Sequence, residues 1–530
     1  MTSLKYCLAC IAILVVGCAQ QPVSSDAPVL TLLHLNDTYR IDAVEDGQRG
    51  GFGRVVTLLR EMKRDGRDVR LLHGGDFLYP SLESQLWDGE QMIEALNFLD
   101  ALAPMYAVPG NHEFDGRSPG AIVNAIRQST FEWLADNLAL TTGAADVDLR
   151  LRRNLVIEAE GLRLGLFALT VHADGGGNRR DYLKIDKNYV EAGRRALREL
   201  QALEPDVIIG LTHLNLEEDR EVAELAAEFP RFELIAGGHE HEVEFEAGDA
   251  TRATILKGAS NARTIWALEF FRQADGQIEL RTRRIAIDSS IASDAEYAVI
   301  ERKWRSQLLA KIPYLEAKLG EAAVPLDGRE TAVRSGESNW GVFIADQMRA
   351  AFGKPAQLAF VNGGTLRIDD YIIDDVSFED VGRTFGFSSF LRHMKITGAD
   401  FRKLLEAGYR GAGPSKGYFP QISGFRVCVD RSRPSLQRIV SLQVPTDSGW
   451  QELEPAREYT LVAPDFLYGG GDGYNFKAAT EVSLPGSELK YRVVDAIAAA
   501  QAQGLKIGSA TDPDNLRIVI LQNADQDCWK

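Results

Sequence analysis

Residues 107–115 read AVPGNHEFD and place three chemically capable side chains within five positions. A hydrophobic strand predicted over Met105–Val108 runs into a Pro-Gly turn, and Asn111, His112 and Asp115 follow it. An amide oxygen can bind a metal ion, an imidazole can move a proton or stabilise charge, and a carboxylate can orient the imidazole. These residue types indicate a metal-assisted hydrolase, and an ordinary polar turn is the alternative for this segment taken alone.

Four other segments repeat this arrangement of a predicted strand followed by Asp or His. Small residues in these segments let the backbone approach an ion closely, and ligand sites of open α/β sheets lie beyond strand ends. We therefore predict that the five strand ends converge on one site. The four segments are Leu30–Leu35 with Asn36-Asp37, Val69–His73 with Gly74-Gly75-Asp76, Val207–Leu211 with Thr212-His213, and Leu234–Ala236 with Gly237-Gly238-His239-Glu240-His241.

The order Asp, GGD, GNHEFD, TH and GGHEH resembles the calcineurin-like metallophosphatase domain of the 5′-nucleotidase family. The resemblance implies two divalent metal ions, roughly 3.5–4 Å apart, that activate a water for attack on phosphorus. It implies that Asp76 bridges the two ions. By the same resemblance, Asp37 and His241 bind the first metal, Asn111, His213 and His239 bind the second, and His112 with Asp115 forms the catalytic dyad.

The first motif departs from the family pattern at Tyr39. The family usually has Asp-x-His here, whereas this chain reads Asp37-Thr38-Tyr39. The phenol could be an oxygen ligand, a hydrogen-bond donor to water on the metal, or a packing residue, and the sequence leaves all three open. It leaves the metals open among Mn²⁺, Zn²⁺ and Mg²⁺, although a shell richer in oxygen favours the harder ions over zinc at the first position.

A second group of motifs continues the resemblance toward the C-terminus. Asn362–Arg367 resembles a segment whose arginine, here Arg367, faces the phosphate or ribose of a nucleotide. Phe419 and Phe466 match two aromatic residues that hold the base, and Asp472 matches a carboxylate that binds the ribose hydroxyls. Stacking contributes about 1–3 kcal/mol per base. The alternative for the two phenylalanines is a place in the hydrophobic core.

One of these C-terminal motifs lacks a residue that the family uses. Phe387-Ser388-Ser389 stands where the family often has Phe-Gly-Asn, so the amide is replaced by Ser389. Arg392 and His393 lie nearby in the sequence and are weak candidates for the missing contact to the base.

The N-terminus resembles an export signal. Lys5 precedes an apolar run, Cys7–Val16, which is too short to span a bilayer. The segment that ends at Cys18 resembles a bacterial lipobox, so we expect residues 1–17 to be a lipoprotein signal peptide, Cys18 to be lipidated and residues 18–27 to be a tether. An ordinary signal peptide is the alternative. Ala19 favours the periplasmic side of the outer membrane within the cell envelope.

Export changes the interpretation of the two remaining cysteines. Cys428 and Cys528 are the only cysteines of the chain beyond this segment, and in an oxidising compartment they are a disulfide candidate. One buried and one frayed thiol is the alternative.

Length and charge set the remaining limits. With 530 residues the chain has material for two hydrophobic cores, and its formal charge of −17 leaves no basic surface for a nucleic-acid polymer.

Together with the family resemblance, the length predicts an α/β (α+β) chain with a smaller C-terminal α/β domain. The predicted parts are a four-layer α/β/β/α metallophosphatase sandwich over 28–290, a linker helix capped by Ser293 within 291–325, a nucleotide-binding domain over 326–523 and a tail over 524–530.

These features predict an exported, lipid-anchored enzyme that releases phosphate from nucleotides. The alternatives are a 2′,3′-cyclic-nucleotide phosphodiesterase or a UDP-sugar hydrolase. A thiosulfohydrolase and a non-catalytic surface binding protein fit the motifs less well. The expected partners are a nucleotide and, through the lipid, a membrane, whereas the sequence makes no prediction of the oligomeric state.

Overall fold

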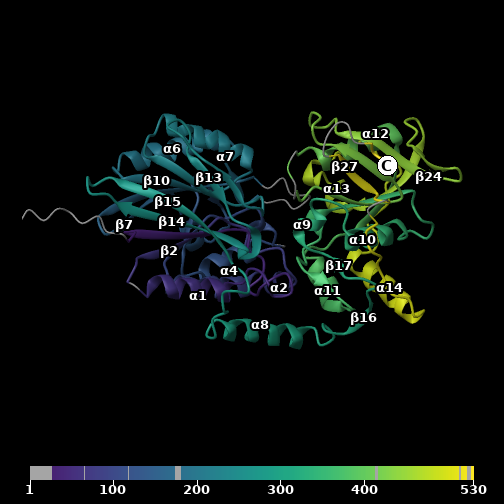
Figure 1. Ribbon diagram of the computed structural model, residues 1–530, viewed down its shortest axis with the longest axis horizontal. Coiled ribbons are helices and arrows are strands. Elements are labelled where there is room, and N and C mark those ends of the chain that lie inside the picture. The colour runs from purple at the N-terminus through teal and green to yellow at the C-terminus, as the bar shows by residue number, and fades with distance from the viewer. Residues whose placement is uncertain are drawn as a thin grey trace, which may run out of the picture.

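The computed structural model describes residues 27–530 except 65, 117, 173–180, 412, 414–415, 513–514, 522–526 and 530. The predicted signal peptide, the lipidation site Cys18 and the tether up to residue 26 lie outside the described residues. Two domains lie side by side, and helix α8 (Ala298–Lys311) runs along one edge of the molecule between them (Figure 1). Within the described ranges, no helix combines the length and the apolar character that crossing a membrane requires.

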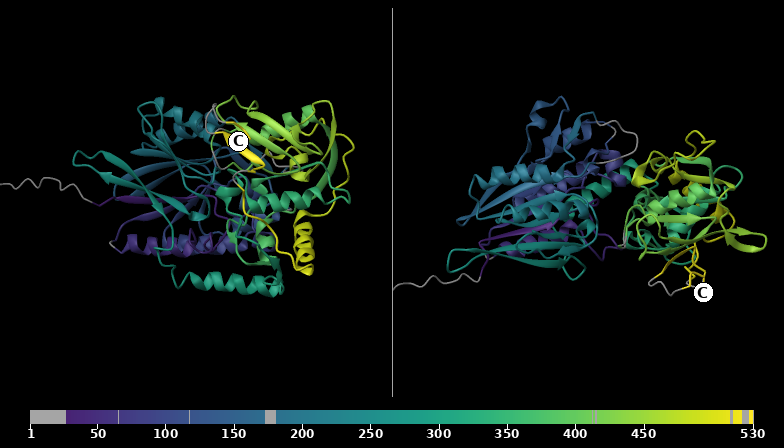
Figure 2. Two further views of the ribbon diagram at one scale, coloured as in Figure 1. Left: turned by 45° about the vertical axis from the view of Figure 1, so that its right-hand side comes forward. Right: turned by 90° about the horizontal axis from the view of Figure 1, so that it is seen from above.

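Two large sheets form the body of the N-terminal domain (Figure 2), and β5 (Leu138–Leu140) pairs with β9 (Leu183–Ile185) in a small third sheet. The central strands of the two large sheets are parallel and buried on both faces, which explains why they read as continuous apolar runs. The seven-stranded sheet has the order β15 (Ile278–Ala286), β14 (Thr264–Arg272), β1 (Leu30–Leu35), β2 (Val69–His73), β3 (Met105–Ala107), β4 (Glu132–Leu134) and β6 (Leu151–Arg152). The six-stranded sheet has the order β12 (Glu244–Glu246), β13 (Thr254–Lys257), β11 (Phe232–Gly237), β10 (Val207–His213), β8 (Leu162–Thr170) and β7 (Leu155–Ala159).

Three hydrophobic cores stack these sheets into layers. Leu32 and Leu72 of the first sheet share one core with Leu211 and Leu256 of the second, so the sheets pack face to face. The outer face of the first sheet packs on α1 (Phe52–Lys63), α3 (Glu90–Leu102) and α4 (Gly120–Gln128). The outer face of the second packs on α6 (Tyr189–Gln201) and α7 (Leu216–Ala223). The predicted α/β/β/α sandwich is therefore confirmed.

The strand boundaries match the sequence prediction at β1 and β2 and differ at β3, β10 and β11, of which β11 begins two residues before and ends one residue after the predicted Leu234–Ala236. β1 and β2 have the predicted bounds, and β3 ends one residue early, at Ala107. β10 continues through His213, because Thr212 and His213 still pair with Leu169 and Thr170 of β8. His213 is therefore the last residue of a strand rather than part of the loop after it.

The helix between the domains begins later than predicted. Ser293 does not cap it: the helix starts after Tyr297, and the Asp294 side chain accepts hydrogen bonds from the N–H groups of Glu296 and Tyr297. The Ser293 hydroxyl instead packs over Gly53, where a Cβ atom would lie 2.1 Å from it. Trp304 and Leu308 are its buried residues, and the helix ends before Pro313.

The C-terminal domain contains two four-stranded sheets with helices around them. Its first strand, β16 (Lys318–Glu321), lies within the segment predicted as linker and pairs with β20 (Asp375–Ser377). The sheets have the orders β21 (Leu391–Thr397), β26 (Glu458–Pro464), β18 (Leu358–Asn362), β22 (Pro420–Ser423), and β25 (Gly449–Glu452), β24 (Ile439–Thr446), β23 (Arg426–Asp430), β27 (Ile518–Leu521). The helices include α9 (Glu330–Val333), α10 (Asn339–Arg349), α11 (Phe378–Thr384), α12 (Gly398–Glu406), α13 (Asp465–Tyr468) and α14 (Leu489–Ala502).

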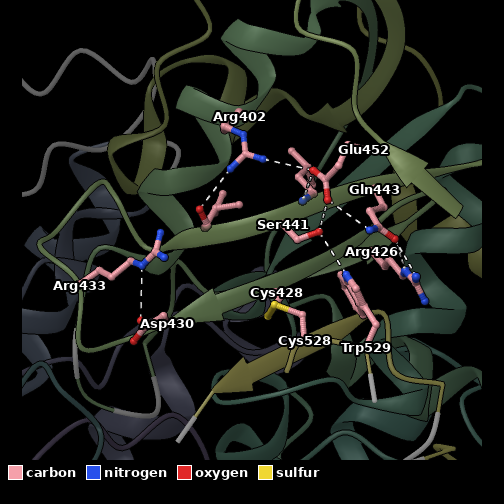
Figure 3. The surroundings of a disulfide bond; sticks show 12 residues. Arg402, Arg426, Cys428, Asp430, Arg433, Ser441, Gln443, Glu452, Cys528 and Trp529 are labelled. Atoms are coloured by element: carbon pink, nitrogen blue, oxygen red, sulfur yellow. Dashed lines mark hydrogen bonds and ion pairs between the residues drawn. A yellow bond between two sulfur atoms is a disulfide. The ribbon is translucent and has the colours of Figure 1, made fainter. Parts of the chain in front are cut away.

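A disulfide between Cys428 and Cys528 joins β23 to the C-terminal tail (Figure 3). The indole of Trp529, next to Cys528, donates a hydrogen bond to the Ser441 hydroxyl, and the Arg426 guanidinium lies 4.0 Å from its ring centroid. The structure thus pairs the two cysteines and rejects the alternative of two separate thiols.

Candidate functional site

Two clusters of potential metal ligands lie where the sandwich strands end. Asp37, Asp76 and His241 form one cluster, and Asp76, His213 and His239 form the other, with all ligand atoms of each cluster within 4.8 Å of one another. Asp76 belongs to both clusters, which is the position that a bridging ligand requires. Carboxylates with imidazoles suit first-row cations, so the side chains fit two metal ions.

The second cluster is completed by Asn111. Its Oδ1 atom lies 3.3 Å from Nε2 of His213, which in turn lies 3.3 Å from Nδ1 of His239. His213 Nε2 is also 3.2 Å from the Asp76 carboxylate, while its Nδ1 atom contacts the carbonyl oxygen of Gly74 at 2.6 Å. That contact fixes the ring so that Nε2 faces the cluster.

Several of these ligands have an uncommon backbone conformation. Asp37, Asp76, His239 and His241 have φ angles of 53°, 60°, 86° and 66°. Non-glycine residues rarely adopt positive φ, and they persist in it where the surrounding structure holds them. Gly110 allows the loops to meet, since a Cβ atom there would lie 2.2 Å from an Asp76 carboxylate oxygen.

A buried carboxylate, Glu113, organises the loops beneath the metal ligands. It accepts hydrogen bonds from the N–H groups of Asp76, Phe77 and Leu78 at 2.9, 2.7 and 3.1 Å. Burial and the nearby Asp76 raise the pKa of Glu113 to about 7. Glu113 lies inside the NHEFD motif, but no role was predicted for it from the sequence.

His112 and Asp115 form a pair in which Asp115 contacts Nδ1 of the imidazole. The backbone N–H of His112 donates to the Asp76 carboxylate at 2.7 Å, which fixes the dyad relative to both clusters. On the other side, Nε2 of His112 lies 3.4 Å from the Arg367 guanidinium, which belongs to the C-terminal domain. The imidazole is thus oriented by a carboxylate, as the predicted dyad requires, and its Nε2 atom faces the Arg367 guanidinium.

Charge within the site is strongly coupled. Burial opposes ionisation of Asp76, but His213 and His112 hold its pKa below the usual range. Burial lowers the pKa of His213, yet the Asp76 carboxylate reverses this and raises that pKa to about 10. Burial and then His213 lower the pKa of His239. The charges of Asp76, His213 and His239 are therefore interdependent.

Tyr39 lies inside the first cluster rather than beside it. Its hydroxyl oxygen is 2.8 Å from Nε2 of His241, and only 6% of the residue is exposed to solvent. Burial, then Asp76 and Asp37, raise the pKa of the phenol well above its ordinary value. The structure therefore disfavours a packing role for this residue.

The carboxylate that orients His241 comes from the C-terminal domain. Glu330 of α9 lies 2.6 Å from Nδ1 of His241 and accepts a 2.6 Å hydrogen bond from Ser260. Arg334, and His241 less strongly, hold the pKa of Glu330 below its usual range against the effect of burial. The second domain thus contributes directly to the geometry of the first cluster, which no sequence motif indicated.

Three C-terminal motifs converge through hydrogen bonds. The Asn362 amide donates to the Asp472 carboxylate at 2.7 Å, which links the NGG segment to the GGGDG segment. The N–H groups of Gly363 and Gly364 donate to the carbonyl oxygens of Phe419 and Gly417, each at 2.7 Å. The residues predicted to hold a nucleotide are therefore neighbours in space.

The two predicted aromatic residues have different environments. The ring of Phe466 lies over Gly471, where a Cβ atom would meet it at 2.5 Å, and 37% of the residue is exposed. Phe419 is 3% exposed and packs edge-to-face on Tyr409, with 5.6 Å between ring centroids. In this arrangement Phe466 offers the larger face to a ligand.

The two residues suggested to replace the missing amide make contacts within the protein. Arg392 donates to the carbonyl oxygen of Ser483, and the His393 ring packs near Phe352 at 5.4 Å. Ser389 is buried, and its carbonyl oxygen accepts from the N–H of Leu489.

Two side chains that the sequence analysis did not assign also lie at these sites. The Phe387 ring is 5.5 Å from the His112 ring, and the Arg410 guanidinium donates to the carbonyl oxygen of Asp472 at 2.8 Å. Phe387 belongs to the Phe387-Ser388-Ser389 segment, so the family resemblance could have identified it as a site residue. Arg410 lies in no recognisable motif.

Known proteins resemble this chain over both domains. The sequence model of the calcineurin-like phosphoesterase family matches residues 30–243, and that of the 5′-nucleotidase C-terminal domain matches residues 318–481. The 5′-nucleotidase of Homo sapiens is 24% identical over 500 residues, which cover 84% of each chain. The trifunctional nucleotide phosphoesterase of Bacillus subtilis is 23% identical over 506 residues, covering 87% of this chain and 33% of that one.

Solved structures share the whole architecture. A 5′-nucleotidase precursor from Thermus thermophilus superposes with a TM-score of 0.79 at 23% identity, covering 93% of this chain and 99% of the other. A sulfate thiohydrolase from the same species superposes with a TM-score of 0.73 at 15% identity, covering 94% and 98%. At these identities the likeness shows a common two-domain fold.

Proposed function

Because the chain belongs to the 5′-nucleotidase family of calcineurin-like phosphoesterases, and is thus a metal-dependent phosphoric ester hydrolase, we propose that it releases phosphate from nucleoside monophosphates. Asp37, Asp76 and His241 would hold the first metal ion. Asp76, Asn111, His213 and His239 would hold the second. When bound, the ions supply Lewis acidity, which lowers the pKa of water and neutralises phosphoryl oxygens.

A buried, unpaired donor supports the assignment of phosphate as the group bound. Nη1 of Arg367 is buried and has no hydrogen-bond partner among the described residues. The guanidinium also lies 5.3 Å from the Tyr39 ring and 5.6 Å from the Phe387 ring, so it is held between the two domains. A buried cationic donor without a partner is costly, and a phosphoryl oxygen would satisfy it with a charge-assisted bond.

The dyad supplies the proton chemistry of the proposed reaction. Asp115 contacts Nδ1 of His112, so the proton on that nitrogen is fixed and Nε2 faces the site. An imidazolium in this position donates a proton from Nε2 to the oxygen that leaves phosphorus, or neutralises the charge that develops there. Arg367 contacts the same nitrogen, so it places the phosphoryl group beside the proton donor.

Recognition of a nucleoside follows from the C-terminal motifs. Asp472 can accept hydrogen bonds from ribose hydroxyls, and its bond from Asn362 fixes its orientation. Burial raises the pKa of this carboxyl, although Arg410 opposes the shift. The exposed ring of Phe466 provides a face for the base, since any base can stack on an aromatic ring.

Replacing Phe466 with alanine is expected to raise KM for a nucleoside monophosphate by about tenfold, because stacking on one face of the base is lost. Hydrolysis of a small aryl phosphate, which has no base, should change little. The matched control is Phe390→Ala, because Phe390 is exposed to the same 37% as Phe466. Steady-state kinetics on both substrates provide the readout, and equal losses on the two substrates would make Phe466 a packing residue.

We also propose that the protein is exported and anchored by lipid on Cys18, on the periplasmic side of the outer membrane or elsewhere in the cell envelope. The lipobox-like sequence supports this proposal. The pairing of Cys428 with Cys528 is consistent with an oxidising compartment.

A phosphate-release screen tests the choice of substrate. The purified protein is supplied with single metal ions and offered nucleoside monophosphates, 2′,3′-cyclic nucleotides, UDP-sugars and an aryl phosphate. Nucleoside monophosphates should give the highest kcat/KM. A higher value for cyclic nucleotides or UDP-sugars would instead support the corresponding alternative, and no turnover of any ester would overturn the assignment.

A further inference from the structure

The hydroxyl of Tyr39 is surrounded by atoms that accept hydrogen bonds. It lies 2.8 Å from Nε2 of His241, 3.3 Å from Oδ1 of Asp37 and 3.4 Å from Oδ2 of Asp76. Nε2 of His241 and Oδ1 of Asp37 are themselves 3.4 Å apart. Four atoms from four residues thus form one compact, buried cluster.

This cluster has too few protons for its acceptors. Nδ1 of His241 contacts the Glu330 carboxylate, which places the proton of the neutral ring on Nδ1 and leaves a lone pair on Nε2. Oδ2 of Asp76 also lies 3.2 Å from Nε2 of His213, so the single proton of the Tyr39 hydroxyl is shared between Nε2 of His241 and Oδ1 of Asp37 and can satisfy only one of them. A cation bound between these atoms would satisfy the lone pairs that the proton leaves over.

The distances are those of ligands around one ion. A cation with bonds of about 2.1 Å has neighbouring ligands about 3.0 Å apart in an octahedral shell and about 3.4 Å apart in a tetrahedral one. The ring is also held in place, 5.2 Å from the His241 ring and 6.1 Å from the His112 ring.

We propose that the Tyr39 oxygen is the fourth protein ligand of the first metal position and makes it a site for ferric iron, an inference that rests on the proposed function for the existence of that position. On binding, the phenol O–H bond breaks, an oxygen–iron bond forms and the proton passes to solvent. The resulting shell contains the imidazole of His241 and three anionic oxygens, from Asp37, Asp76 and Tyr39. Three negative charges on hard donors match a hard trivalent cation better than zinc.

The second position differs and is not included in this proposal. Its donors are the neutral groups of Asn111, His213 and His239 together with the shared carboxylate of Asp76. One anionic donor and two imidazoles suit a divalent ion.

Visible absorption tests the proposal directly, because iron(III) bound to a phenolate absorbs visible light by charge transfer from oxygen to iron. The chelator-treated full chain is titrated with a soluble ferric complex. We expect a visible band that saturates at about one iron per chain, with phenolate vibrations in resonance Raman spectra excited in that band. Zinc at the same position should give no colour.

Three variants assign the band to one residue. Tyr39→Phe should lose the band and bind iron at least about tenfold more weakly, as expected for loss of a ligand. Tyr39→His should remain colourless on addition of iron while it still binds a divalent ion at the first position, which keeps the test valid if the phenylalanine variant does not fold. Tyr79→Phe is the matched control, because Tyr79 is also 6% exposed but contacts Asp88, and it should keep the band.

The possible outcomes separate this inference from the proposed function. Failure of the wild-type chain to bind ferric iron, a colourless iron-loaded chain, or a band that survives in Tyr39→Phe would each overturn the inference. Phosphate release by a colourless chain would leave the proposed function intact. A coloured chain that hydrolyses no phosphate ester would support the ligand and contradict the function.

Discussion

Asp76→Ala is expected to remove both metal ions from the purified chain and to reduce phosphate release by about 10³-fold or more, since the Lewis acidity that it holds contributes several kcal/mol. Asp76 is the residue common to both ligand clusters, and its carboxylate also accepts a 2.7 Å hydrogen bond from the backbone N–H of His112. Its loss therefore affects both metal positions and the placement of the dyad. Metal content by elemental analysis and turnover of a nucleoside monophosphate are the measurements.

The control for Asp76→Ala is another carboxylate of the same domain. Asp100 accepts from the N–H of Met105 at the start of β3 and lies in neither ligand cluster, so Asp100→Ala should retain both metals and activity. Retention of two tightly bound ions in folded Asp76→Ala would contradict the assignment of Asp76 as the bridge.

His112→Ala is expected to reduce kcat by about 10²–10⁴-fold while metal content stays at the wild-type level, which is the usual effect of removing a positioned proton donor. The imidazole lies outside both ligand clusters, although its ring is fixed by Asp115 and approached by Arg367. Asp115→Asn should cause a smaller loss, because the ring remains but its orienting charge does not. Wild-type turnover by His112→Ala, or loss of its metals, would show that the dyad has another role.

The strand ends were predictable from sequence because several constraints coincide there. Apolar runs that are buried on both faces identify β1, β2, β10 and β11, and the small residues after them mark the loops that approach one another. The resemblance to the 5′-nucleotidase family then distinguished the predicted metal ligands from the predicted catalytic dyad. The boundary of β10 was missed, because Thr212 and His213 are polar residues that still pair in the sheet.

Contacts between the domains could not be predicted in the same way. Glu330 lies 89 residues from His241, in a short helix without a motif, and only the fold brings the two together at 2.6 Å. Arg367 was identified by its motif, yet its contact with His112 depends on how one domain packs on the other. Side-chain burial also depends on that packing, which is why sequence could not distinguish the environment of Phe419 from that of Phe466.

The role of Tyr39 shows what structure adds to a single departure from a pattern. The sequence left three roles open, and the position of the hydroxyl, 2.8 Å from His241 and within 3.4 Å of two carboxylates, supports a metal ligand. A phenolate at Tyr39 would add a negative charge to the first position, whereas the second position is surrounded by Asn111 and two histidines.

Metal-dependent phosphate release measures the central claim most directly. The chain is stripped with a chelator, dialysed, and assayed on a nucleoside monophosphate while metal is added back in known amounts. The structure predicts no release from the stripped chain and a rise that reaches its maximum at two ions per chain, because Asp76 joins two ligand clusters. Phosphate release that is unaffected by chelation, or that saturates at a single ion, would contradict a dinuclear mechanism.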